Sequence, residues 1–259
     1  MTARTSLVAL AAIGFAVLPA AALAAPAVAL VGDKTLVSFD TETGATGASV
    51  DVSGVDSLLG IDVRPADNAL YGVAADGSVV IIDLTSGAAT VKSMLSEKLA
   101  AGVSASVDFN PVADRLRIVG SDGTNLRANV DDGMTTVDGK LNFDAADANA
   151  AATASVVAVA YTNSVGKPEK TAMYDIDTKL GLLQQTTPND VVLATRGALG
   201  VTGATYAFDI AATADLTNTA YLATGGALHT VNLETGAATK TVDLAIEGDV
   251  RDIAILPAM

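Results

Sequence analysis

The sequence predicts an all-β protein, a five-bladed β-propeller in which the last strand pairs with the first strands. The first observation is a four-strand unit between Leu59 and Gly87, where apolar and β-branched runs alternate with turn formers such as Asp76-Gly77. The second is that this unit recurs 46 residues later without a gap. A repeat of this length built from four strands is typical of a propeller blade. The matched positions are Asp62 and Asp108, Pro65 and Pro111, Leu70 and Leu116, Val73 and Val119, and Gly87 and Gly133.

The two ends of the chain supply the third observation. Residues 27–31 and 35–40 read as strands and align with the second and third strands of the unit, so the first strand is missing there. Residues 250–257 resemble that first strand in character. Pairing the two ends within one blade closes the ring and removes exposed sheet edges.

The remaining units follow in order and bring the number of blades to five. Inner-strand positions fall at 62, 108, about 159, 209 and 252. The third unit is the most degenerate, since Val159 stands where the others have aspartate, and we interpret Met173–Asp177 as its third strand. Residues 93–101 are expected to form one or two helical turns, and residues 142–153 a short helix or loop.

The first 25 residues read as a secretory signal peptide. Arg4 supplies a positive charge, residues 7–18 form an apolar core too short to span a membrane, and Ala22-Leu23-Ala24 is a small-x-small cleavage site. The chain has no cysteine, which excludes a lipid anchor at the cleavage point and disulfide bonds. We therefore expect a periplasmic or secreted protein with a single propeller domain over residues 26–259 and no membrane insertion after cleavage.

Composition and charge narrow the possible partners. Half of the residues are hydrophobic, only 4% are aromatic, and the formal net charge is −14. An acidic protein repels phosphate backbones and anionic lipid surfaces, so binding to nucleic acid is disfavoured. Solubility of an exported protein accounts for the acidity more simply than an acidic docking surface does.

Aspartate recurs inside the otherwise apolar inner strands, where an unpaired carboxylate would be costly. One interpretation is structural: each side chain accepts backbone N–H groups from the adjacent turn and ties the blades together. The other is a ring of carboxylates at one mouth of the channel that binds a hard cation such as Ca²⁺. The structural role is the more economical, because the feature repeats with the unit. These residues are Asp62, Asp108, Asp209 and Asp252.

Arginines gather in the second complete unit and its neighbour. Arg115 and Arg117 alternate on one strand, Arg127 follows across a hairpin, and Arg64 lies in the preceding unit. Ion pairing with Asp108, Asp114 or Asp122 would explain them. The functional alternative is a clamp for an anion or carboxylate, which guanidinium groups bind bidentately.

Other patterns favour structure over chemistry. Asp40, Asp83, Asp177 and Asn232 begin Asx-x-x-x-Gly turns, with Asn129 continuing the series, and such turns are explained by Asx hydrogen bonding and a glycine at positive φ. His229 is the sole histidine and is expected to be a packing or surface residue. No nucleophile elbow, phosphate loop or paired cysteine is present, so the sequence predicts no catalytic residues and no organic cofactor.

Several segments resemble a bacterial family known as domain of unknown function 4394. They are Leu59–Pro65, Val107–Val119, Asn125–Arg127, Ala158–Asn163 and Gly197–Val201, and the Asp-Phe-Asn-Pro and Asp-Arg-Leu-Arg-Ile-Val blocks are the most specific. The resemblance covers nearly the whole chain after the leader. It implies a propeller-like exported protein without an assigned activity and names no catalytic residues.

Three functions are compatible with these patterns. The first is a binding module that holds a protein, a glycan or a small anionic ligand on loops at one face. The second is a metal-assisted hydrolase or lactonase acting at the channel mouth through the inner-strand aspartates. The third is a passive envelope component without a ligand. Binding ranks first, because no nucleophile and base pair is visible.

Overall fold

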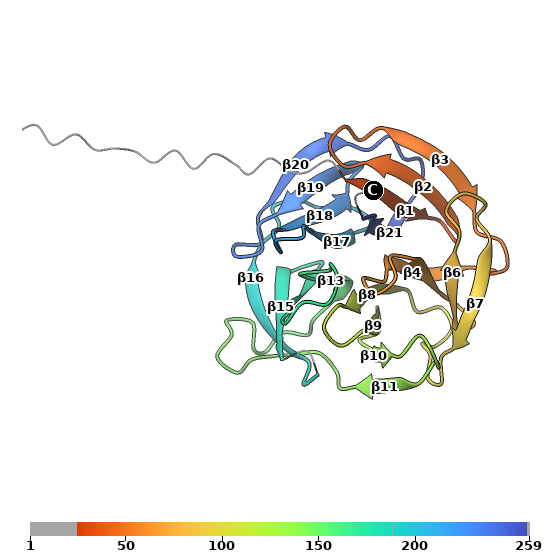
Figure 1. Cartoon of the computed structure of the whole chain (residues 1–259). Helices are drawn as coiled ribbons and strands as arrows, with labels where there is room; N and C mark the ends of the chain where they lie inside the picture. Colours follow the sequence, from red (N-terminus) through yellow and green to blue (C-terminus); the bar gives the residue numbers. More distant parts are fainter. Residues whose placement is uncertain (1–24, 188, 258–259) are drawn as a thin grey trace, which may run out of the picture.

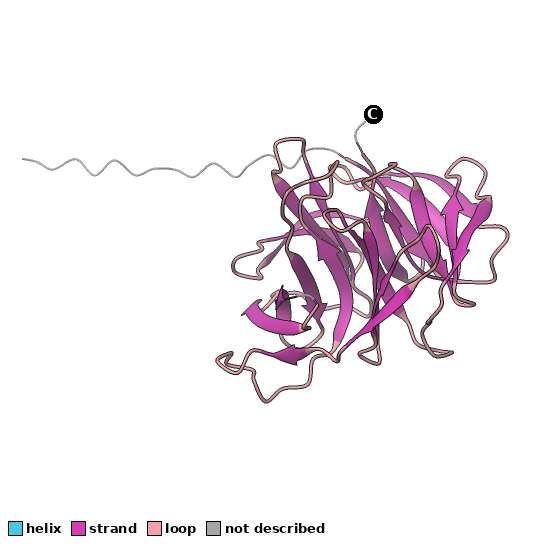
Figure 2. Ribbon diagram, turned by 60° about the horizontal axis from the view of Figure 1, so that its bottom comes forward, coloured by secondary structure: helices cyan, strands magenta, loops and turns pink. Residues whose placement is uncertain are grey.

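The computed structural model describes residues 25–187 and 189–257. The predicted signal peptide, residues 1–25, lies outside the described residues except for Ala25. Within the described ranges the regular elements are 21 β-strands and no helix, and Figure 2 shows strands and loops alone. The model thus confirms the all-β prediction.

The strands form five small sheets arranged as a ring (Figure 1), which confirms the five-bladed propeller. Within each blade the strands run antiparallel from the centre of the ring outwards, except for a short parallel strand at the outer edge of one blade. We number the blades from the N-terminus. Blade 2 contains β4 (Leu58–Val63), β5 (Leu70–Ala74), β6 (Ser78–Ile82) and β7 (Ala89–Met94); blade 3 contains β8 (Ala105–Asn110), β9 (Arg115–Gly120), β10 (Asn125–Ala128) and β11 (Thr135–Asp138); blade 5 contains β17 (Ala207–Ala212), β18 (Asn218–Thr224), β19 (Ala227–Val231) and β20 (Ala238–Asp243).

Blade 1 joins the two ends of the described chain, as the sequence predicts. β1 pairs on one side with β2 and on the other with β21, which occupies the innermost position. Leu30 faces Asp252 and Val28 faces Ala254 in the closing pair. This pairing covers the inner edge of β1, which would otherwise be left unpaired. Its members are β21 (Val250–Ile255), β1 (Pro26–Val31), β2 (Thr35–Asp40) and β3 (Thr46–Asp51).

Blade 4 departs most from the repeat and corrects one sequence-based expectation. Met173–Asp177 pairs directly with the inner strand, so it is the second strand of the blade and not the third. Between blades 2 and 3 a second expectation is wrong: residues 93–101 are not helical, but begin as the end of β7 and continue as an irregular loop. Of the two alternatives for residues 142–153, the loop is confirmed: the segment begins as a two-residue strand, parallel to β16, and continues as turns. The strands are β13 (Val156–Tyr161), β14 (Met173–Asp177), β15 (Gly181–Thr187), β16 (Val192–Gly197) and β12 (Asn142–Phe143).

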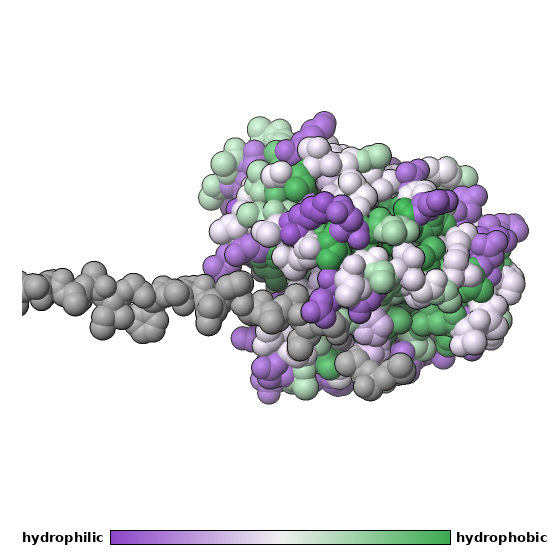
Figure 3. Space-filling model, turned by 90° about the horizontal axis from the view of Figure 1, so that it is seen from above, coloured by the Kyte–Doolittle hydropathy of each residue, from purple (hydrophilic) through white to green (hydrophobic). Residues whose placement is uncertain are grey.

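The core lies between blades, not within one. Five clusters of buried apolar side chains each span two neighbouring blades, and in one of them the rings of Tyr71 and Phe109 meet edge to face at 5.3 Å. Outer strands such as β3 and β20 are largely exposed. Hydrophilic and hydrophobic residues are interspersed on the side of the ring seen in Figure 3. Burial of apolar surface between blades is therefore the main force that holds the ring together.

A repeated turn adds a backbone contact between blades. In blades 1, 2, 3 and 5 an Asx side chain caps the turn before the last strand; Asp40 Oδ1, for example, accepts the Thr43 N–H at 2.7 Å. The glycine that closes the turn has positive φ and lies against the outer strand of the preceding blade. A Cβ on Gly133 would come within 1.9 Å of the Met94 carbonyl oxygen. The Ser96 N–H also donates to the Gly133 carbonyl at 2.9 Å.

We expect Gly133→Ala to destabilise the protein by at least about 2 kcal/mol more than Gly123→Ala does. The two glycines have similar φ values of 76° and 83°, but nothing lies within 4 Å of a Cβ on Gly123. The control therefore carries only the cost of an L-residue at positive φ, about 1 kcal/mol. Urea unfolding of both variants measures the difference, and equal losses would show that the contact with blade 2 contributes nothing.

Candidate functional site

The inner strands of the five blades surround the centre of the ring (Figure 1), and four of them carry an aspartate. We call these residues the axial aspartates; their exposed fractions lie between 1% and 7%. One carboxylate oxygen from each of Asp62, Asp108 and Asp209 lies within 4.8 Å of the other two. Residues 46 or more positions apart in the sequence thus form one acidic cluster. The axial aspartates are Asp62 on β4, Asp108 on β8, Asp209 on β17 and Asp252 on β21.

Each axial aspartate accepts a backbone N–H from the inner strand of the next blade, and not from the adjacent turn as the sequence suggested. These bonds run in one direction around the ring and link neighbouring blades at the axis. Three of the four carboxylates also accept the N–H of the residue that follows them. The inter-blade bonds are Phe109 N to Asp62 Oδ2 (2.6 Å), Tyr161 N to Asp108 Oδ1 (3.1 Å), Ile255 N to Asp209 Oδ2 (2.6 Å) and Ile61 N to Asp252 Oδ2 (3.0 Å).

The series of axial bonds is interrupted between blades 4 and 5. Val159 occupies the equivalent place on β13 and has no oxygen to offer. The two blades are linked instead by side-chain amides near the ends of their inner strands: Asn218 Oδ1 accepts the Asn163 N–H at 2.7 Å, and Asn218 Nδ2 donates to Asn163 Oδ1 at 2.8 Å. One of the five inner interfaces therefore lacks a carboxylate.

Burial dominates the electrostatics of the axial aspartates. It raises the pKa of Asp209 to about 6 and the pKa values of Asp62, Asp108 and Asp252 well above their ordinary range. Repulsion between the carboxylates adds to the rise in the pKa of Asp62 and Asp108, while the backbone N–H bonds oppose it. Within the described ranges no ion pair reaches any of the four. At neutral pH the cluster therefore favours either bound protons or a cation.

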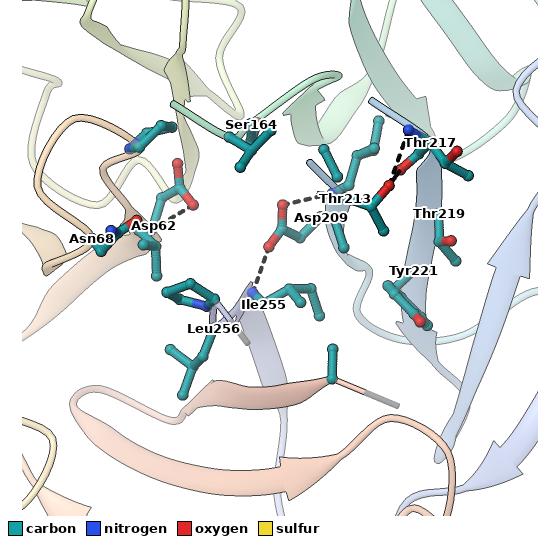
Figure 4. Close-up of a pocket in the computed structure, with 18 of the residues that line it drawn as sticks. Asp62, Asn68, Ser164, Asp209, Thr213, Thr217, Thr219, Tyr221, Ile255 and Leu256 are labelled. Atoms are coloured by element: carbon teal, nitrogen blue, oxygen red, sulfur yellow. Dashed lines mark hydrogen bonds between the residues drawn. The ribbon is translucent and has the colours of Figure 1, made fainter. Parts of the chain in front are cut away.

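A cavity of about 380 Å³ opens at the end of the channel where β4, β17 and β21 finish. Asp62 and Asp209 lie at its inner end and point towards the space between these strands (Figure 4). Asp108 and Asp252 do not line it. Its walls are mostly apolar and include no basic side chain. The other lining residues are Ala25, Val63, Pro65, Asn68, Ser164, Val165, Ile210, Ala211, Ala212, Thr213, Ala214, Thr217, Thr219, Tyr221, Ile255, Leu256 and Pro257.

The four arginines of the predicted anion clamp do not form one cluster. Arg64 is buried and its guanidinium forms a two-bond contact with Asp114, with Nε and Nη2 donating at 2.8 and 2.7 Å. It also donates to Asp131 and to the Tyr71 hydroxyl. These contacts raise the pKa of Arg64 and lower that of Asp131 to about 2. Asp114 and Asp131 therefore occupy the guanidinium N–H groups of Arg64 that an anionic ligand would need.

Of the other three arginines, buried Arg117 and half-buried Arg127 share one carboxylate, and Arg115 is exposed. Arg117 is 1% exposed and shares Asp138 with Arg127, whose Nε and Nη2 donate to that carboxylate at 2.8 and 3.0 Å. Arg117 also donates to the Tyr161 hydroxyl at 3.2 Å. Arg115 is exposed and its guanidinium donates to local backbone carbonyls. The anion clamp therefore stays a prediction, without support from a shared binding face.

Sequence reasoning named Asp114, which pairs with Arg64, but missed the cavity and two other partners of the arginines, Asp131 and Asp138. The cavity walls come from segments that are far apart in the chain, around residues 65, 164, 213 and 256. Asp138 carried a usable signal, because it ends a short alternating strand that pairs with the strand containing Arg127. His229 is buried, with Nδ1 3.3 Å from the Leu222 carbonyl oxygen, in agreement with a packing role.

Comparison with known proteins places the chain in a family. A family model described as "Domain of unknown function (DUF4394)" matches residues 35–254. The chain belongs to this family. The match confirms the resemblance seen in the segments around the axial aspartates, and the propeller is the fold of this DUF4394 chain. No curated protein matches the chain.

Solved structures with a similar fold have low sequence identity. A protein of unknown function from Bacteroides thetaiotaomicron is 16% identical with a TM-score of 0.53, and the match covers 91% of this chain but only 65% of that structure. A protein of unknown function from Bacteroides caccae is 13% identical with a TM-score of 0.41, covering 86% of this chain and 75% of the other. The computationally designed Ika8 protein is 13% identical with a TM-score of 0.39, covering 86% and 63%. The first likeness concerns the fold alone.

The raised pKa values predict that, without a bound cation, the protein is most stable near pH 4 and loses stability as the pH rises from there through about 6 and 7. A carboxyl group whose pKa is higher when folded stabilises the fold in its protonated form, and this stabilisation is lost as the pH rises through the folded pKa. A pKa near 6 for Asp209, against 3.8 as the usual value, corresponds to roughly 3 kcal/mol. Buried Asp175, with a pKa of about 7, acts in the same direction. Below about pH 4 the groups with lowered pKa, such as Asp131, lose their contribution.

Urea unfolding at pH 5 and pH 8, in the presence of a chelator, measures this dependence. We expect a lower free energy of unfolding at pH 8, and a smaller difference in Asp209→Asn, because asparagine does not titrate. The groups that face Asp209 from other inner strands are Asp62, Asp108 and Asp252, all of which act in the same sense. Equal or greater stability at pH 8 in the chelated wild type would contradict the assignment.

Proposed function

We propose that the chain is an exported binding module that holds a small molecule in the cavity at the channel mouth. The observation that carries the proposal is the cavity itself. Its volume of about 380 Å³ lies in the range of small-molecule sites, and its mostly apolar walls surround a few polar groups. The ends of three inner strands hold the floor, while loops form the rim, an arrangement that propellers commonly use for binding.

Export to the periplasm or the medium is part of this proposal. It is supported by the charged start, apolar core and small-x-small site within residues 1–25, and by the absence of cysteine. In the ranges that the structure describes, no helix has the length and apolar character needed to cross a membrane. Among the three classes of partner, a protein, a glycan and a small molecule, the cavity favours the small molecule.

Filling the cavity tests this function. Ala212 lines the cavity and is half-buried at the end of β17, so Ala212→Trp should occupy much of the space. We expect saturation-transfer NMR with a set of small amines, alcohols, carboxylates and monosaccharides to detect binders to the wild type, and at least tenfold weaker signals in Ala212→Trp. Ala101→Trp, at an exposed position in the loop between blades 2 and 3, is the matched control.

Ser164→Trp provides a second obstruction from blade 4, for use if Ala212→Trp does not fold. Circular dichroism melts establish that each variant is folded. Binding that survives both substitutions would place the ligand elsewhere and refute the proposal, as would the absence of any binder to the wild type.

Metal-assisted hydrolysis at the channel mouth is the second candidate. The observation that favours it is the triad of oxygens within 4.8 Å, since carboxylates are the ligands that Ca²⁺ prefers. Hydrolysis by such an ion needs a position open to substrate, and only Asp62 and Asp209 of the triad line the cavity. The ion would bridge these two residues and Asp108 behind them.

Elemental analysis of the purified mature protein tests whether the protein binds a metal ion. A metal site predicts about one ion per chain in the wild type and a loss of the ion in Asp108→Asn, because the triad then retains two carboxylates. Asp175→Asn is the matched control, since Asp175 is also a fully buried aspartate but lies on β14 outside the triad. Protein that contains no metal after dialysis against millimolar Ca²⁺ would exclude this candidate.

A further inference from the structure

Two fixed carboxylates form the inner end of the cavity. Asp62 accepts the Phe109 and Val63 N–H groups at 2.6 Å, one on each oxygen. Asp209 accepts those of Ile255 and Ile210, also at 2.6 Å and on separate oxygens. These bonds hold the orientation of both side chains. A carboxylate has about four acceptor sites, so each group retains capacity for a ligand.

The charge of these carboxylates is not balanced by the protein. No lysine, arginine or histidine lines the cavity, and the buried arginines of the described chain pair with Asp114, Asp131 and Asp138 elsewhere. A cationic ligand would supply the missing charge.

The distance between the carboxylate oxygens of Asp62 and Asp209 allows one ligand nitrogen to bind both. One oxygen of Asp62 and one of Asp209 lie no more than 4.8 Å apart. A nitrogen placed between them can therefore reach both at about 2.8 Å, which is the length of a charge-assisted hydrogen bond. An ammonium group has three donors, so two go to the carboxylates and one remains for the channel or for water.

The rest of the cavity favours an organic body on that nitrogen. Val63 and Ile210 line the cavity, and Ile255 and Leu256 present apolar side chains near the carboxylates (Figure 4). A bare Ca²⁺ ion needs six to eight oxygen ligands and would leave most of the cavity to water. An alkyl or aryl group attached to the nitrogen would instead cover the apolar walls.

We infer that the cavity takes a small organic cation, a primary amine with an apolar body, whose ammonium group binds between Asp62 and Asp209. This inference rests on the proposed function, because it names the ligand class of the same cavity. It differs from the anionic ligand that the arginine pattern suggested, both in place and in charge.

Isothermal titration calorimetry with three hexyl probes tests the inference. n-Hexylamine, 1-hexanol and hexanoate share an apolar body and differ in the charge of the head group. At pH 7.5 we expect hexylamine to bind at least about tenfold more tightly than hexanol, and hexanoate more weakly than either. In Asp209→Asn the preference for hexylamine over hexanol should disappear, whereas the Asp175→Asn control should keep it.

The outcomes separate the inference from the function on which it rests. If all three probes bind equally and Ala212→Trp abolishes them, the cavity is a binding site but the amine preference is refuted. If no probe binds the wild type, the inference is overturned, and the NMR screen decides on the function separately. Should Asp209→Asn fail to fold, Asp62→Asn replaces it; a preference that survives a folded variant refutes the placement of the ammonium group.

A last comparison distinguishes an amine from a metal. Asp108 belongs to the oxygen triad but does not line the cavity. In Asp108→Asn the hexylamine affinity should fall less than in Asp209→Asn, because the contacting carboxylates remain. Equal losses in both variants, together with Ca²⁺ binding to the wild type that excludes hexylamine, would assign the cluster to the metal instead.

Discussion

The ring depends on the pairing of β21 with β1. This single antiparallel contact joins residues more than 200 positions apart and turns five separate sheets into a closed structure. It also places Asp252 where it can accept the Ile61 N–H of blade 2 and lie near Asp209 of blade 5. The axial cluster and the cavity above it exist only in the closed ring, because Ile255 and Leu256 of the last segment form part of the cavity wall. Closure is thus a condition for the site as well as for the fold.

The axial aspartates serve two purposes that oppose each other. Their hydrogen bonds connect neighbouring inner strands, and the backbone N–H groups stabilise the charged form. Their burial and mutual proximity favour the neutral form and raise the pKa values. Sites that keep like charges close together commonly lower the stability of the empty protein, and a ligand that neutralises the charge recovers it. These opposing effects on the charge of the cluster are therefore themselves a reason to consider a cationic ligand.

Much of the fold was accessible from the sequence, because each blade repeats its own local pattern. Asp62 and Asp108 stand in matching apolar strands, and the missing first strand at one end was found at the other. The strand order of blade 4 was predicted wrongly because the same turn motif can lie between different pairs of strands. The Asx turn at Asp177 joins the second and third strands of blade 4, whereas the same motif at Asp83 precedes a fourth strand, and only the pairing partners distinguish them.

The site was less accessible, because its parts come from different blades. The partner of Asp62 is Phe109 in the neighbouring inner strand, a contact that no pattern within one unit reveals. The sequence indicated Asp114 as an ion-pair partner, and it does pair with Arg64, but it did not indicate Asp131 and Asp138, because these lie in a turn and an outer strand that the repeat does not highlight. The cavity depends on loop conformations around Ser164 and Thr213, which vary between units and carry no periodic signal.

Val159 stands where the other inner strands carry an aspartate, so the interface between blades 4 and 5 differs from the other four. We call this interface the seam. At this interface the neutral Asn163–Asn218 amide pair replaces a charge-assisted bond, which is the stronger kind of link. Ser164 on one side of the seam and residues 210–219 on the other line the cavity. Local opening of the propeller should therefore occur mainly between blades 4 and 5. Each such opening would widen the entrance of the cavity for a ligand.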